Sequence, residues 1–263
     1  MVLIEDILEV PKDCIVNIVI PKKEVFEAAA LNNKDKNIFT DLIKQIKWCY
    51  NFTEDNIRVD KFIDDERRYE EVELININLK YENVHKIDVG RFKEDDKIDR
   101  IAEIVMRFIP YPIILTIQYN KELKFYGAHI RESKADYDKI VIDGEILSTN
   151  WMNTNDLNDI EKDFISKIKF DNLERINFYS FYNSYYEALV KYNGEIVVGK
   201  TVNLPTEEIE KINNEISKLD DKIRRIEKAI NDEPNFNRKM ELNIEADDLK
   251  VQKKKLLNEL EGE

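Results

Sequence analysis

The sequence predicts an α+β fold, with a mixed or antiparallel sheet on which helices pack, followed by a C-terminal antiparallel helical hairpin (coiled coil). Between residues 98 and 130, a helical pattern is followed by two strand patterns that a short turn joins. This order is typical of a sheet with helices on one face. From residue 206 onward the apolar residues instead keep a heptad spacing. We therefore expect a globular domain at residues 1–203 and a hairpin at residues 204–263.

The first third of the chain predicts strands and helices in alternation. Residues 15–20 are mostly β-branched and stop at Pro21, which favours a strand followed by a helix. Apolar residues at three- and four-residue spacing predict a helix within residues 37–50. We expect strands near residues 56–62 and at residues 72–79, the second of them half-buried because apolar and polar residues alternate along it.

The clearest folding unit begins with a helix at residues 98–109 that Pro110 ends. Strands at residues 113–119 and 123–130 follow, joined by a turn at residues 120–121. Further strands are expected near residues 139–142 and 194–202. Further helices are expected near residues 156–167 and 178–191.

The tail contains two arms of equal length, each with an apolar seam. The first spaces its residues 3, 4, 3, 4, 3 and 4 apart: Ile209, Ile212, Ile216, Leu219, Ile223, Ile226 and Ile230. The second alternates in the same way: Leu242, Ala246, Leu249, Lys253, Leu256 and Leu260. The segment NDEPNFN separates the two arms, so they predict two antiparallel helices that pair through their seams.

More apolar residues lie in the second arm than one seam accounts for. Four of them fall outside the seam and are expected to form a protein-interaction surface beside it: Met240, Ile244, Val251 and Leu257. A second copy, another protein or the globular domain would cover this surface. The arms carry 16 acidic and 12 basic residues, which is typical of a solvated coiled coil and not of a cationic DNA clamp.

Composition limits the class of protein. The 263 residues are 43% apolar and 36% charged, which is typical of a globular protein, and the net charge of −13 argues against coating nucleic acid by bulk charge. Cys14 and Cys49 are too few for a disulfide framework or a metal cluster. The segment MVLIEDILEVPKD does not resemble a signal peptide, and MRFIPYPIILTI is too short to span a bilayer. We expect a soluble cytoplasmic protein.

One fragment suggests chemistry. Glu122 and Lys124 form a Glu-x-Lys pair of the kind that metal-dependent nucleases place on a strand. Such a site needs a further acidic ligand, and the preceding strand IILTIQY has none, while Glu103 on the helix before it cannot replace the missing ligand. A solvated hairpin turn is the simpler interpretation, with a degenerate metal-dependent nuclease as the alternative.

The other candidate motifs favour structural roles. The aromatic segment NFYSFYNSYYEALVKY could stack on unpaired bases, but several of its rings share one helical face, which favours a core or docking face. The acidic segments at residues 64–71 and 93–99 lack the spacing and glycine of a calcium loop. His85 and His129 have no nucleophile beside them in a recognisable motif. The sequence therefore predicts no catalytic residue, no metal site and no cofactor.

Five segments in fixed order carry a family resemblance: IPKKEVFE, IKQIKW, RFIPYPIILTIQY, NWM and NFNRKMELNIEADDLK. The sequence resembles a prokaryotic family known as a domain of unknown function, family 4391 (DUF4391). The resemblance covers most of the chain and carries no activity or site residue over. It implies genes that lie beside DNA methyltransferases and helicase-type ATPases in restriction and phage-defence clusters.

Together these observations predict a non-enzymatic accessory or assembly subunit of a restriction-modification or phage-defence complex. Its coiled coil would bind a protein partner, such as the methyltransferase or the helicase-type ATPase subunit, or a second copy. Nucleic acid would be reached only through the complex, and no membrane is involved. The alternatives are the degenerate nuclease and a nucleic-acid-binding module.

Overall fold

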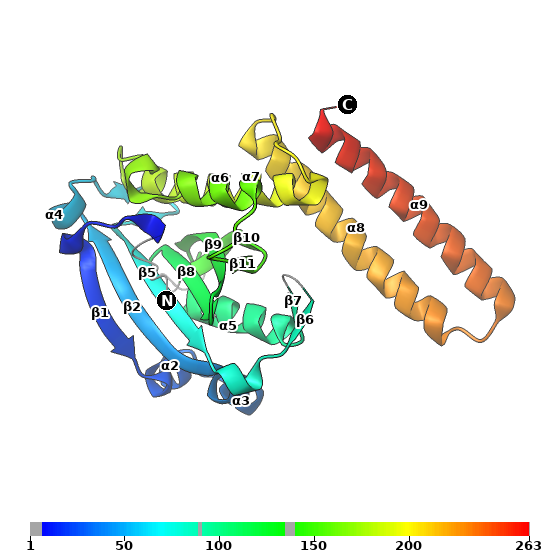
Figure 1. Cartoon of the computed structure of the whole chain (residues 1–263), viewed down its shortest axis with the longest axis horizontal. Coiled ribbons are helices and arrows are strands. Elements are labelled where there is room, and N and C mark those ends of the chain that lie inside the picture. Colours follow the sequence, from blue (N-terminus) through cyan, green and yellow to red (C-terminus); the bar gives the residue numbers. More distant parts are fainter. Residues whose placement is uncertain (1–6, 89–90, 135–139, 263) are drawn as a thin grey trace. The chain divides into compact units, whose positions relative to one another are not determined.

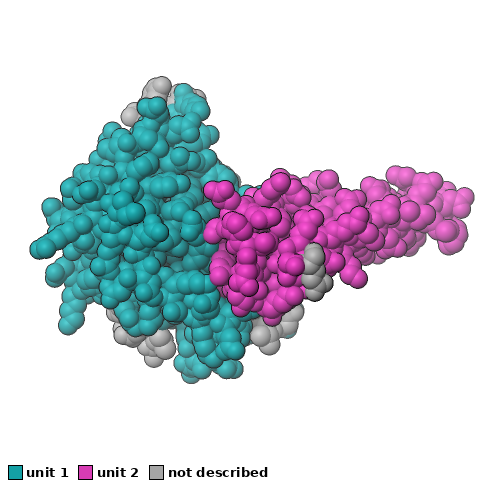
Figure 2. Space-filling model, turned by 90° about the horizontal axis from the view of Figure 1, so that it is seen from above, with its two compact units in different colours: residues 1–189 teal, residues 190–263 magenta. Residues whose placement is uncertain are grey.

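The computed structural model describes residues 7–88, 91–134 and 140–262. The chain divides into two compact units, residues 1–189 and residues 190–263 (Figure 2). The division falls inside one long helix, between Leu189 and Val190. The domain boundary expected between residues 203 and 204 lies in the segment after that helix, and it stays a prediction.

The first unit is built on a seven-stranded sheet with the strand order β1-β2-β5-β8-β9-β10 and with β11 beside β9. Neighbouring strands are antiparallel except for β5 and β8, which are parallel. The sheet strands are β1 (Ile15–Ile20), β2 (Ile43–Thr53), β5 (Glu71–Leu79), β8 (Ile113–Tyr119), β9 (Glu122–Glu132), β10 (Ile140–Ser148) and β11 (Met152–Asn153). Two short hairpins pair β3 (Phe62–Ile63) with β4 (Arg68–Tyr69), and β6 (Lys86–Asp88) with β7 (Arg91–Phe92).

Helices cover both faces of this sheet (Figure 1). On one face lie α2 (Lys22–Ala28), α3 (Asn33–Leu42) and α5 (Asp95–Phe108), which enclose the main apolar core with the sheet. On the other lie α6 (Asp159–Lys167) and the first part of α7 (Phe178–Val198). The expectation of helices on one face was therefore wrong, and β5 is buried on both faces instead of half-buried. The short helices are α4 (Glu54–Ile57), η1 (Lys12–Cys14), η2 (Tyr81–Asn83) and η3 (Phe170–Asn172).

Three predicted elements were wrong. The strand expected near residues 56–62 does not form, because α4 ends at Ile57 and the next strand, β3, begins only at Phe62. The helix expected within residues 37–50 ends at Leu42, and β2 runs from Ile43 to Thr53. Its β-branched and aromatic residues favour a strand, and the pairing of β2 with both β1 and β5 stabilises it. The strand expected at residues 194–202 is instead the last turn of α7 and the segment after it. The strand expected at residues 139–142 begins β10, and Lys139 lies outside the described residues.

A tyrosine hydroxyl from α7 lies between two strands where their pairing ends. The β8–β9 ladder stops at Leu115 and Tyr126. Beyond it, the Tyr182 hydroxyl accepts a hydrogen bond from the Ala128 amide at 3.0 Å and lies 2.9 Å from the carbonyl oxygen of Ile113. Because buried backbone groups need partners, this hydroxyl fixes α7 on the sheet.

Gly127 of β9 also lets α7 pack closely on the sheet. A Cβ atom at Gly127 would lie 2.7 Å from the Leu189 Cδ1 atom and 2.8 Å from the Tyr185 Cε1 atom. A larger residue at this position would force the Leu189 or Tyr185 side chain to move.

The second unit contains the predicted hairpin, formed by α8 (Thr206–Asp232) and α9 (Phe236–Glu261). Ion pairs show that the helices are antiparallel, because Asp220 contacts Lys253 while the later Glu227 contacts the earlier Lys250. Asn235 caps α9 by accepting hydrogen bonds from two backbone amides of its first turn. The hairpin prediction is thus confirmed.

Candidate functional site on the helical hairpin

The two helices of the hairpin pair through the predicted seams. The α8 seam is buried at Ile209, Ile212, Ile216, Leu219 and Ile223, and the α9 seam at Leu242, Ala246 and Leu260. Lys253, the one polar seam residue, directs its Nζ atom to both Asp220 carboxylate oxygens, at 2.7 and 2.8 Å. This ion pair balances the positive charge of Lys253, so the helices α8 and α9 accommodate the polar residue in their seam.

Four large apolar side chains on α9 remain exposed, by between 51% and 72%: Phe236, Met240, Ile244 and Val251. We call them the outer row. Ile244 follows the seam residue Leu242 by two positions and Val251 follows Leu249 by two, which is about 200° around a helix of 3.6 residues per turn. The outer row therefore faces away from α8. An exposed row of large apolar side chains on a helix is typical of an interaction surface.

The sequence predicted an interaction surface beside the seam at Met240, Ile244, Val251 and Leu257, and the structure places the first three opposite the seam. Leu257 differs, because it is half-buried and follows the seam residue Leu256 directly. Phe236 was missed. Its position immediately after the turn residue Asn235, eight residues before Ile244, could have identified it as the start of the row.

The Glu122 and Lys124 pair lies at the start of β9 on the same face as α5. The Lys124 Nζ atom is 2.7 Å from Asp99 Oδ1, which also accepts a hydrogen bond from the Tyr126 hydroxyl at 2.7 Å. Glu122 forms an ion pair with Lys86. The carboxylates of Glu122 and Asp99 thus each face a lysine ammonium group. A metal ion would have to displace that lysine to bind either carboxylate. Sequence reasoning missed Asp99, because only the packing of α5 on β9 brings it to Lys124.

His129 lies among buried tyrosines between β9 and α7. Its Nε2 atom is 3.2 Å from Asn183 Oδ1, which accepts hydrogen bonds, and its Nδ1 atom is 2.9 Å from the Tyr69 hydroxyl. A neutral ring that donates from Nε2 and accepts at Nδ1 satisfies both contacts. Burial lowers the pKa of His129 to about 4, which agrees with that state.

The aromatic segment on α7 lies in the interior. Its rings are at most 5% exposed at Phe178, Phe181, Tyr182, Tyr185, Tyr186 and Tyr192. Buried rings cannot stack on nucleic-acid bases, so this helix offers no base-stacking platform at those positions.

Glu73 is a buried carboxyl group near the start of β5, 7% exposed. Burial, with the nearby charge of Glu71, raises its pKa to about 7. In the register of the sheet it lies beside Asn51 of β2, whose Oδ1 atom is buried without a hydrogen-bond partner. The described residues place no cation against Glu73.

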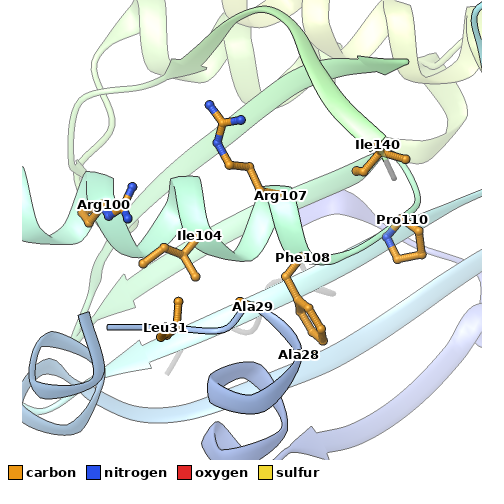
Figure 3. A pocket seen from close by; sticks show the side chains of 9 residues that line it. All are labelled: Ala28, Ala29, Leu31, Arg100, Ile104, Arg107, Phe108, Pro110 and Ile140. Atoms are coloured by element: carbon orange, nitrogen blue, oxygen red, sulfur yellow. The ribbon is translucent and has the colours of Figure 1, made fainter. Parts of the chain in front are cut away.

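A groove of about 480 Å³ lies between α5, the end of α2 and the start of β10 (Figure 3). Two of the residues that line it, Arg100 and Arg107, are already ion-paired. Arg100 contacts Asp35 and Glu103, and Arg107 contacts Glu103. An anion would therefore compete with carboxylates for both guanidinium groups, and the remaining lining is apolar or small: Ala28, Ala29, Leu31, Ile104, Phe108, Pro110 and Ile140.

Neither a metal-binding group nor a membrane span is found in the described parts of the chain. No three His, Cys, Asp or Glu side chains converge there as they would around an ion. None of the described helices combines the length and the apolarity that crossing a bilayer requires.

Comparison with known families supports the resemblance found in the sequence. The model of the family described as "Domain of unknown function (DUF4391)" matches residues 8–256, nearly the whole chain. The chain belongs to the DUF4391 family. Searches of the curated proteins and of the solved structures returned no match. In this DUF4391 protein the match covers both the sheet and the greater part of the hairpin.

Proposed function

We propose that this protein is a non-enzymatic accessory or assembly subunit of a prokaryotic restriction-modification or phage-defence complex in the cytoplasm. It acts through a coiled coil formed by α8 and α9, which holds a protein partner. The partner is a methyltransferase or helicase-type ATPase subunit of the same complex, or a second copy.

The outer row of α9 is the observation that supports this proposal. A solvated hairpin needs one apolar seam on each helix, and α9 has an apolar row on its opposite face as well. Exposing Phe236, Met240, Ile244 and Val251 to water costs free energy, which burial against a partner recovers at about 25 cal/mol for each Å² of apolar surface. The acidic net charge of −13 also fits a protein that meets DNA only through its partners.

The test is co-purification with a tagged methyltransferase or ATPase subunit encoded beside the gene. Ile244→Glu combined with Val251→Glu should abolish co-purification, because each new carboxylate would be buried at the interface. Ser217→Glu combined with Ala229→Glu is the matched control. It adds the same two charges to exposed positions of α8 and should leave co-purification intact.

Circular dichroism checks that both double variants keep the helicity of the wild-type protein. If the outer-row variant folds and still binds both tagged subunits as the wild type does, the hairpin does not hold these partners and the proposal fails.

A further inference from the structure

The charged residues around Val251 are arranged symmetrically in sequence and oppositely in sign. Asp247 and Asp248 precede Val251 by four and three residues, and Lys254 and Lys255 follow it by three and four. On a helix these offsets lie on the same face as Val251. The exposed apolar side chain therefore lies between an acidic pair toward the N-terminus and a basic pair toward the C-terminus.

None of these four charged side chains forms an ion pair with α8 in the described part of the chain. The lysines that contact α8 are the neighbouring Lys250, which pairs with Glu227, and Lys253, which pairs with Asp220. No described residue forms an ion pair with either the two aspartates or the two lysines. All four side chains are exposed. Their charges are thus available to a molecule that docks on the outer face of α9.

We propose that a second copy of this chain docks there, with the two α9 helices antiparallel and crossing at Val251. A two-fold axis at Val251 places residue 247 opposite residue 255 of the other copy, and residue 248 opposite residue 254. Each acidic pair then faces the other copy's basic pair, which gives four ion pairs around a Val251–Val251 contact. Such a surface is self-complementary, as the interface of a symmetric dimer must be.

The pattern distinguishes this arrangement from a parallel one. Two parallel α9 helices would place aspartates against aspartates and lysines against lysines, which is unfavourable. In the antiparallel register Ile244 lies opposite Asn258. Phe236 and Met240 extend beyond the other copy's α9, which ends at Glu261.

This inference rests on the proposed role of the hairpin as an assembly surface and names its first occupant. The two claims fail separately. A dimer that does not co-purify with either tagged subunit would overturn the proposed hetero-partner and leave the dimer standing. A monomer that does co-purify would overturn the dimer alone.

The test is the mass of the full chain by sedimentation equilibrium, in a concentration series that reaches about 200 μM because small interfaces bind weakly. The wild type should approach 62.6 kDa, twice the 31.3 kDa of one chain. Asp247→Lys with Asp248→Lys places lysines against lysines, and Lys254→Asp with Lys255→Asp places aspartates against aspartates. Each double variant alone should dimerise at least about tenfold more weakly.

Mixing the two double variants should restore the dimer, because every residue at 247 and 248 then faces the opposite charge in the other copy. The quadruple variant, with both pairs exchanged, should dimerise by itself for the same reason. Because all four positions are exposed, helicity should stay at the wild-type level. A monomeric wild type, double variants that dimerise normally, or a mixture that stays monomeric would each overturn the proposal.

Discussion

The Tyr182 hydroxyl is the contact whose removal most sharply tests how α7 is held on the sheet. Tyr182→Phe keeps the ring and removes one oxygen atom. That oxygen accepts from the Ala128 amide at 3.0 Å, and it lies 2.9 Å from the carbonyl oxygen of Ile113 and 3.0 Å from that of Ala128. Because Tyr182 is 0% exposed, water cannot replace it without a rearrangement of the core.

The magnitude follows from the groups left without a partner. The variant leaves one amide and at least one carbonyl group buried and unsatisfied, and each such group costs about 1–3 kcal/mol. Partial relaxation around the vacated position reduces the sum. We therefore expect the free energy of unfolding of the first unit to fall by about 2–3 kcal/mol.

Urea unfolding monitored by tryptophan fluorescence measures this change, since Trp48 and Trp151 both lie in the first unit. The midpoint should fall while the m-value stays constant. Tyr179→Phe is the matched control. Tyr179 lies on the same helix, half-buried, and among the described residues none hydrogen-bonds to its hydroxyl, so we expect a change below about 0.5 kcal/mol. Equal stability of the wild type and both variants would refute the reasoning.

Two further predictions concern ionisable groups. Burial raises the pKa of Glu73 from its ordinary 4.5 to about 7, so the folded state binds this proton more tightly than the unfolded state does. Stability should fall by up to about 3 kcal/mol as pH rises from about 4.5 to about 7, and Glu73→Gln should flatten this part of the unfolding profile; an unchanged slope would contradict it. The second prediction is that the chain does not cleave DNA or RNA with Mg²⁺ or Mn²⁺. The reason is that Lys86 pairs with the Glu122 carboxylate and Lys124 pairs with the Asp99 carboxylate. A fluorogenic assay that shows cleavage lost in Glu122→Ala would disprove it.

The sequence predicted the hairpin well because each helix carries its own repeat. The spacing of Ile209 to Ile223 and of Leu242 to Leu260 specifies a seam locally, and Pro234 marks the turn. The unit from α5 to β9 was predicted for the same reason, since a periodic helix, a proline and two strand patterns follow one another.

The errors arise where distant residues decide the structure. Ile43 and Ile46 continue the apolar spacing of α3, and only pairing with β1 and β5 makes them part of a strand. Gly194 and the valines after it resemble a strand, yet Gly194 lies within α7. A Cβ atom there would lie 2.7 Å from the Ile209 Cγ2 atom, so the glycine lets α8 approach.

The candidate site was predicted in part. The spacing showed that Met240, Ile244 and Val251 fall outside the seam, but it took the structure to show that they face away from α8. The charge symmetry around Val251 was present in the sequence and acquires meaning once Lys250 and Lys253 are known to be engaged with α8. Contacts such as that between Lys124 and Asp99 join separate elements, and no local pattern encodes them.

Disulfide trapping at Val251 tests the central claim, that the outer face of α9 is an assembly surface, most directly. Val251→Cys places two thiols against each other at the proposed two-fold axis, while the native Cys14 and Cys49 are buried. Ile244→Cys is the control, because that thiol would face Asn258 of the other copy. Mild oxidation should give a linked dimer of the Val251→Cys variant on a non-reducing gel and little of the control. No linked dimer, or equal amounts from both variants, would contradict the account.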